Sequence, residues 1–127
     1  MDEKQTVLAS IDAIWRRGEL GRLGEFWSDG CVNHAAVPTG RGLDALTAYH
    51  QAQFEAFADF VDAQIEVVQQ VGEGERVVTH MVTSAVHRPS GKAVHMATMR
   101  IDRVVDGHIT EHWSVADEAG LLRQLAG

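Results

Sequence analysis

Large apolar residues recur at helical spacing over the first half of the chain. Val7, Ile11, Ile14 and Trp15 follow the i, i+4, i+7, i+8 pattern, which predicts an amphipathic helix that ends near Gly18. The same spacing predicts a shorter helix over residues 20–27 and a third over 43–58. The apolar stripe of the third helix needs a surface to cover, and a sheet is the natural partner.

The second half of the chain changes to β-branched runs separated by turn residues. This texture predicts strands over 61–71, 76–88, 93–105 and 108–116, with a brief earlier strand over 31–34. Asp106-Gly107 is the strongest turn signal, because both central residues of a type I′ hairpin turn need positive φ. Residues 118–125 predict a short terminal helix.

Helices followed by a meander of strands predict an α+β fold. Strands of this length must curve strongly if one face is to wrap against the helices. We therefore expect a half-open cone, in which a curved antiparallel sheet and a helical cover enclose an apolar pocket.

Several segments resemble one known family. The pattern E-H-W-x-x-x-D followed by G-L-L-x-Q-L, within residues 107–125, is similar to the C-terminal signature of the SnoaL-like polyketide cyclases of the NTF2-like superfamily. Val32-Asn33-His34 and Gly40-Arg41-Gly42 resemble the same family. The resemblance implies an NTF2-like cone and a cofactor-independent enzyme that closes a ring in a polyketide by aldol chemistry. It also implies that Asp117 transfers the proton.

Asp117 is the first catalytic candidate from the residues as well. By period two it shares a strand face with Trp113, so its carboxyl is expected in apolar surroundings that raise a carboxyl pKa and suit it to general acid–base work. The alternative is that Asp117 caps the terminal helix. Position alone favours the cap, and the resemblance favours catalysis.

Other polar residues could assist Asp117. His80 interrupts an apolar strand, where it is either a satisfied core histidine or a group that faces the cavity. Asn33 or His34 could donate a hydrogen bond to an enolate oxygen, and only one of them points inward because neighbouring strand residues alternate. The residues predicted to contact substrate are Trp15, Tyr49, Phe54, Met99 and Trp113.

Composition narrows the classes of function. The 127 residues, 45% of them hydrophobic, suit one domain over 1–127, and no segment predicts a membrane span. The net charge of −7 disfavours nucleic acid as a partner. With one cysteine, Cys31, and a polar N-terminus, we expect no disulfide, no secretory signal and a cytoplasmic location.

Seven histidines invite a metal hypothesis that their spacing does not support. His108 and His112 would lie about 13 Å apart along a strand, and parity places them opposite Trp113 and Asp117, exposed or at a subunit contact. We expect no metal and no organic cofactor.

The leading hypothesis is a cyclase acting on a small, apolar, carbonyl-containing molecule. The alternatives are an isomerase, dehydratase or epoxide hydrolase in the same pocket, or a protein that binds a small ligand without catalysis. The outer sheet face should retain apolar residues such as Val78 and Val82, which predicts a homodimer through that face.

Overall fold

The computed structural model describes residues 1–127, and in it three of the four α-helices precede the four long strands, as predicted. The N-terminal part comprises α1 (Glu3–Ser10), the π-helical turn η1 (Ile11–Arg16), the 3₁₀ turn η2 (Leu20–Arg22), α2 (Leu23–Phe26), β1 (Trp27–Asn33), β2 (Gly40–Arg41) and α3 (Gly42–Ala56). The remainder comprises β3 (Phe60–Glu73), β4 (Arg76–His87), β5 (Lys92–Val105), β6 (His108–Ala116) and α4 (Glu118–Ala126).

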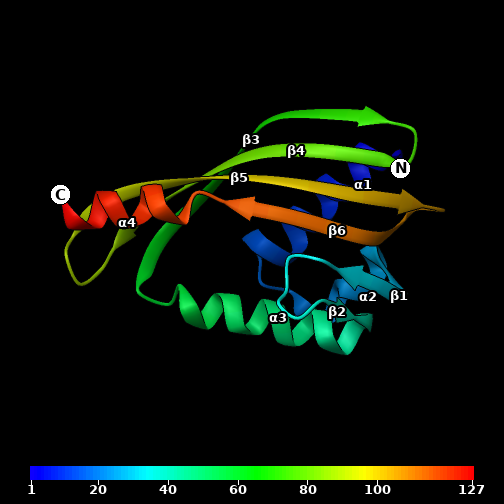
Figure 1. The fold of residues 1–127 in the computed structure, drawn as a ribbon, viewed down its shortest axis with the longest axis horizontal. Coiled ribbons are helices and arrows are strands. Elements are labelled where there is room, and N and C mark those ends of the chain that lie inside the picture. The colour runs from blue at the N-terminus through cyan, green and yellow to red at the C-terminus, as the bar shows by residue number, and fades with distance from the viewer.

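One curved, unclosed six-stranded sheet organises the molecule, in the order β2-β1-β6-β5-β4-β3 (Figure 1). The strands from β3 to β6 form the predicted antiparallel meander, and β1 adds to β6 in parallel. The fold is an α+β cone, as predicted, although the sheet is mixed where a wholly antiparallel one was expected. Asp106 and Gly107 both have positive φ, 51° and 76°, which confirms the hairpin between β5 and β6.

The segment after the first helix differs from the prediction. Residues 20–27 form a 3₁₀ turn and one turn of α-helix, and Trp27 already begins β1. Trp27 is therefore not part of an apolar helix face. Its indole packs in the core, where Nε1 donates to the Ser10 hydroxyl oxygen at 3.3 Å. β1 is therefore longer than the predicted strand over 31–34.

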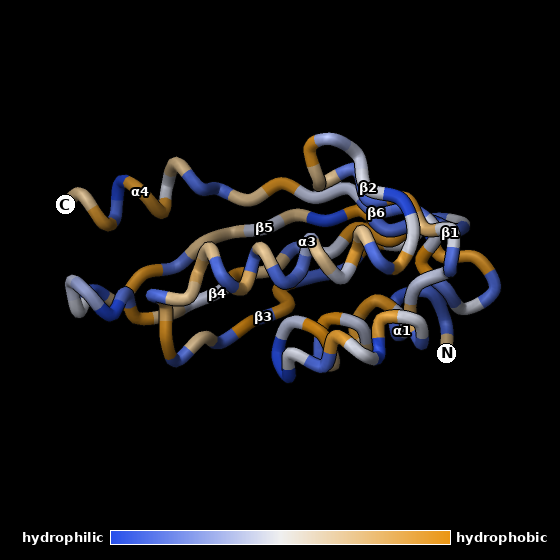
Figure 2. Tube along the Cα trace, turned by 90° about the horizontal axis from the view of Figure 1, so that it is seen from below, coloured by the Kyte–Doolittle hydropathy of each residue, from blue (hydrophilic) through white to orange (hydrophobic).

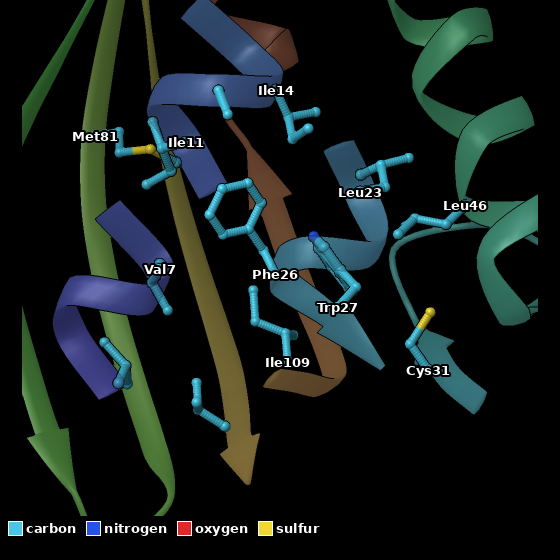
Figure 3. Close-up of a cluster of buried hydrophobic side chains, with 13 residues drawn as sticks. Val7, Ile11, Ile14, Leu23, Phe26, Trp27, Cys31, Leu46, Met81 and Ile109 are labelled. Carbon is cyan, nitrogen blue, oxygen red and sulfur yellow. The ribbon is translucent and has the colours of Figure 1, made fainter. Parts of the chain in front are cut away.

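The core lies between the N-terminal helices and one face of the sheet. Phe26 lies near the centre of this core, with Ile11 on one side and Ile109 and Trp27 on the other (Figure 3). Val77 and Met81 of β4 and Val104 of β5 also lie on the sheet side of this cluster. The core fills only the end of the cone near the β5–β6 hairpin, so the other end is left for a cavity.

α3 and α4 bound the part of the inner face that the core does not fill. Seen from below, α3 passes across β4 and β5, and α4 lies at the end of the sheet opposite β1 (Figure 2). α4 packs on β5, where Lys92 Nζ donates to the carbonyl oxygen of Leu125 at 2.9 Å. No helix of the chain has the length and apolar character needed to cross a bilayer.

The outer sheet face retains apolar side chains, as the strand pattern predicted. Met99, Ile101 and Val115 are exposed there, and Val78 and Val82 are half-buried. The homodimer expected through this face and the cytoplasmic location stay predictions.

Candidate active site

A cavity of about 520 Å³ lies between α3, the inner sheet face and the start of α4. Most of its wall is apolar and aromatic, and the ring-bearing hydrophobic residues that line it are Trp15, Trp27, Tyr49, Phe54, Phe57 and Phe60. This volume suits a small, flat organic molecule. The prediction of an apolar pocket inside the cone is confirmed.

An Arg–Asp–His cluster stands at the deep end of this cavity. Asp102 is fully buried and accepts two hydrogen bonds from Arg100, from Nε at 2.7 Å and from Nη2 at 3.0 Å. The same carboxylate accepts a third from His112 Nδ1 at 2.8 Å. Arg100 and His112 are themselves buried and line the cavity, while Asp102 lies behind them.

A β-bulge places His112 in this cluster. Arg103 pairs with Glu111, whereas Val104 pairs with Ile109, so Thr110 is an extra residue in β6. An extra residue inverts the alternation of side chains beyond it. Ile109 therefore enters the core, and beyond the bulge the even-numbered residues His112, Ser114 and Ala116 line the cavity.

The charges of the cluster follow from its hydrogen bonds. Burial alone would raise the pKa of Asp102, but Arg100 and His112 outweigh it and lower that pKa to about 2. The carboxylate is thus ionised and can only accept, so His112 Nδ1 carries the proton in their bond. Burial, followed by the charge of Arg100, lowers the pKa of His112, so its imidazole is neutral at pH 7 and its Nε2 holds a lone pair.

A second buried histidine faces the same space from α3. His50 is 3% exposed, and its Nδ1 lies 2.9 Å from the carbonyl oxygen of Leu46. A carbonyl only accepts, so Nδ1 is the protonated nitrogen and Nε2 is the acceptor. Burial is the main cause that lowers the pKa of His50 to about 4, with smaller contributions from Arg100 and His112.

The depressed pKa of His50 predicts a loss of stability in mild acid. Because the unfolded chain takes up this proton near pH 6.5 and the folded one near pH 4, the free energy of unfolding should fall as the pH drops from about 6.5 to about 4. For this residue the loss should reach about 3 kcal/mol. Urea denaturation at pH 7.0 and pH 4.5 measures it.

His50→Phe should flatten this pH dependence, because phenylalanine keeps a ring in the site and cannot be protonated. The matched control is His95→Gln, a change at an exposed histidine, which should leave the wild-type dependence in place. An equal loss of stability in His50→Phe and wild type would contradict the assignment.

Asn33 supplies the cavity's unpaired amide. It is buried, lies beside His112 in the β1–β6 register, and its Oδ1 accepts from the backbone N–H of Ala35 at 3.0 Å. Its Nδ2 is the one side-chain nitrogen or oxygen of the protein that is itself fully inaccessible and has no hydrogen-bond partner. A fully buried donor without a partner is costly, so this amide is a candidate to pair with a bound molecule.

Two donors and two acceptors thus remain unpaired at the deep end. The donors are Asn33 Nδ2 and Arg100 Nη1, and the acceptors are the Nε2 atoms of His50 and His112, none of which has a partner within the protein. This arrangement can hold a carbonyl oxygen with its donors and remove a proton with an acceptor.

Asp117 does not occupy the predicted place. Its side chain is exposed and absent from the cavity wall, and its Oδ1 accepts from the backbone N–H of Gly120 at 2.9 Å as the N-cap of α4. The prediction that this carboxyl is sequestered beside Trp113 is wrong, and the helix-cap alternative is the one observed.

Four other predicted residues lie outside the cavity. His34 stacks on Trp113 with ring centroids 4.8 Å apart, and its Nε2 lies 2.9 Å from a Glu111 carboxylate oxygen. Met81 of β4 points into the core, so its neighbour His80 points to the outer face of the sheet, where its Nδ1 lies 3.4 Å from Gln69 Nε2. Met99 is 43% exposed. The four residues His34, His80, Met99 and Trp113 are absent from the cavity wall. The predictions that place Met99 and Trp113 inside are wrong, and of the alternatives left open for His34 and His80 the one outside the cavity is observed.

The remaining predicted residues do line the cavity. Trp15, Tyr49 and Phe54 form part of its aromatic wall, and of the adjacent pair Asn33 is the residue inside. Their contact with a substrate stays a prediction.

Sequence reasoning missed Arg100, Asp102 and the inward side of His112. One signal was present: Arg100 and Asp102 are opposite charges two positions apart, on the strand parity of the apolar Val104. An ion pair at that spacing can neutralise itself on a buried face. Nothing local marks His112, because its orientation depends on the bulge.

The comparisons with known proteins agree with this architecture. A family model described as SnoaL-like polyketide cyclase matches residues 5–125. None of the curated proteins matches the chain.

Solved structures resemble the chain over nearly its whole length. IdmH of Streptomyces antibioticus, a proposed polyketide cyclase, is 24% identical, with a TM-score of 0.82 over 100% of both chains. AclR of Streptomyces galilaeus, a proposed hydroxylase, is 25% identical, with a TM-score of 0.77 over 98% of this chain and 95% of that one. A proposed SnoaL-like polyketide cyclase from a Jannaschia species is 20% identical, with a TM-score of 0.80 over 98% and 92%.

Proposed function

The chain belongs to the SnoaL-like polyketide cyclase family, and on that basis we propose that it removes a proton beside a carbonyl group and closes a ring by intramolecular aldol addition. The proposed substrate is a small, apolar molecule with at least two carbonyl groups. His112 is the proposed general base, Asp102 its positioning residue, and Asn33 and Arg100 the donors to the enolate.

The observation that carries the proposal is the Asp102–His112 pair beside the unpaired Asn33 amide. The 2.8 Å bond to Asp102 fixes the tautomer of His112 and leaves Nε2 as the base. Asn33 Nδ2 lies unpaired on the neighbouring strand of the same cavity wall. A base and an oxyanion donor at one end of an apolar cavity are what enolate formation requires.

The steps balance without another reactant. His112 Nε2 takes the proton from the carbon beside one carbonyl, and the enolate oxygen accepts hydrogen bonds from Asn33 and Arg100. The enolate carbon then bonds to the carbon of a second carbonyl in the same molecule. The resulting alkoxide takes the proton back from His112, which gives a cyclic β-hydroxyketone and a neutral enzyme.

The environments of the two histidines separate their roles. Asp102 stabilises the imidazolium that forms on His112, whereas His50 donates to a neutral carbonyl and has no carboxylate beside it. With a pKa of about 4, protonating His50 at pH 7 costs about 4 kcal/mol. The carboxylate partner is therefore the reason for assigning the base to His112.

Deuterium exchange into 1-tetralone tests the proton abstraction directly. This bicyclic ketone is small and apolar, and it exchanges the protons beside its carbonyl slowly without catalysis. We expect the protein in D₂O to speed the exchange at that carbon above the buffer rate, as followed by NMR.

The exchange rate should also report the protonation of His112. Since burial lowers its pKa below 6.5, the rate should hold across neutral pH and fall only as the pH drops below 6.5. Asp117→Asn, a change at the exposed helix cap, should exchange at the wild-type rate. Binding of 1-tetralone without exchange would favour the non-catalytic alternative.

A further inference from the structure

His50 is a buried titratable group that the proposed mechanism does not use. Proton removal needs one base, and the deep end of the cavity has two open acceptors, His50 Nε2 and His112 Nε2. We propose that His50 is a specificity-determining residue, whose Nε2 selects ligands that present a hydroxyl or enol hydrogen to the cavity. The proposal shares with the proposed function only the cavity as binding site.

The backbone of α3 fixes which nitrogen of His50 can accept. Its Nδ1–H donates to the Leu46 carbonyl one helical turn earlier, at 2.9 Å. The ring is also held by aromatic neighbours, with centroids 4.9 Å from Trp15 and 5.6 Å from Tyr49. The ring is therefore restrained from turning to offer Nδ1–H to a ligand, and Nε2 can only accept.

A fixed acceptor in this position discriminates by chemistry. A hydroxyl donates to Nε2, whereas the oxygen of a methyl ether has no hydrogen and would set two lone pairs against each other. In a buried site this difference is large, because no water replaces the missing hydrogen bond. Carbonyl or ether oxygens can still accept from Asn33 or Arg100, so the donors of the site do not make this distinction.

The selected ligand therefore combines an apolar ring system with a hydrogen-bond donor at one end. From Arg100 to Val94 the β5 wall extends about 20 Å at the usual strand rise, and it changes from charged to apolar along the way. A hydroxylated or enolised aromatic compound would lie along this wall with its hydroxyl beside His50.

The test compares the binding of 1-naphthol, 1-methoxynaphthalene and naphthalene by quenching of tryptophan fluorescence, since Trp15 and Trp27 line the cavity. For the wild type we expect 1-naphthol to bind at least about tenfold more tightly than the other two. Equal affinities for 1-naphthol and its methyl ether, or no binding of 1-naphthol, would overturn the proposal without any variant.

Two variants locate the acceptor. His50→Phe should reduce the tenfold preference to about twofold or less, because the ring stays and the acceptor is lost. The matched control is Thr98→Val, which removes a hydroxyl group from the β5 side of the same cavity with little change in side-chain size and should keep the preference. If Thr98→Val lost the preference for 1-naphthol and His50→Phe kept it, the proposed role of His50 would be wrong.

The binding test and the exchange test fail separately. Naphthol does not turn over in the proposed reaction, so a protein that prefers naphthol yet never exchanges 1-tetralone would refute the proposed function and support the role of His50. Exchange of 1-tetralone without a preference for 1-naphthol would support the proposed function and refute the role of His50.

Discussion

His112→Gln should lower the rate of 1-tetralone exchange about 10²- to 10⁴-fold, the usual loss when a general base is removed. Glutamine keeps polarity and approximate size but has no lone-pair nitrogen to take the proton. The exchange rate per enzyme, measured by NMR at pH 7.5, reports the loss. Binding of 1-tetralone should weaken much less, because the aromatic wall of the cavity is unchanged.

Two further measurements show whether His112 acts as a base. The acid limb of the pH–rate profile should disappear in His112→Gln, whereas a packing defect would lower the rate at every pH and keep that limb. His108→Gln is the control, because His108 lies on the same strand near the hairpin turn, outside the cavity. A His112→Gln rate within threefold of wild type would exclude His112 as the base.

Asp102→Asn should lower the free energy of unfolding by about 3–5 kcal/mol, because it leaves the buried guanidinium of Arg100 without a counter-charge. Arg100 is 3% exposed and directs two hydrogen bonds at the Asp102 carboxylate. Urea denaturation at pH 7 measures the change.

The double variant Arg100→Met/Asp102→Leu should recover most of that stability, since apolar residues of similar volume remove both charges from the interior. Glu75→Gln is the matched control, because it breaks the exposed ion pair with Arg103 at 3.1 Å. We expect Glu75→Gln to cost less than about 1 kcal/mol. If Asp102→Asn cost no more than Glu75→Gln, the buried cluster would not have the role assigned to it.

Buried charges of this kind are weak evidence for stability and stronger evidence for function. An apolar pair would fill the same space on β5 at lower desolvation cost. The cluster instead holds a neutral imidazole with its lone pair toward an apolar cavity. A perturbed titratable group in a cleft is a frequent mark of a reactive site.

The sequence by itself determined the architecture, because the architecture follows from patterns that persist over many residues. The stripe of Val7, Ile11 and Ile14, the β-branched runs and the Asp106-Gly107 turn each act locally, and they agree with one another. They fixed the helix–strand order, the meander and the apolar pocket. The family followed from the C-terminal block, even though Asp117 within it caps a helix.

Only the tertiary structure decided which side chains face the cavity. One extra residue, Thr110, is set by pairing with β5, and it places His112 inside and Trp113 outside. The pattern of one strand does not show its register with the neighbouring strand. A shift of one residue therefore reverses the predicted face of every side chain beyond it. For the same reason the sequence could not show which of Asn33 and His34 points inward. The burial of Arg100 and Asp102 likewise depends on both lying on the inner face of the sheet, beside His112.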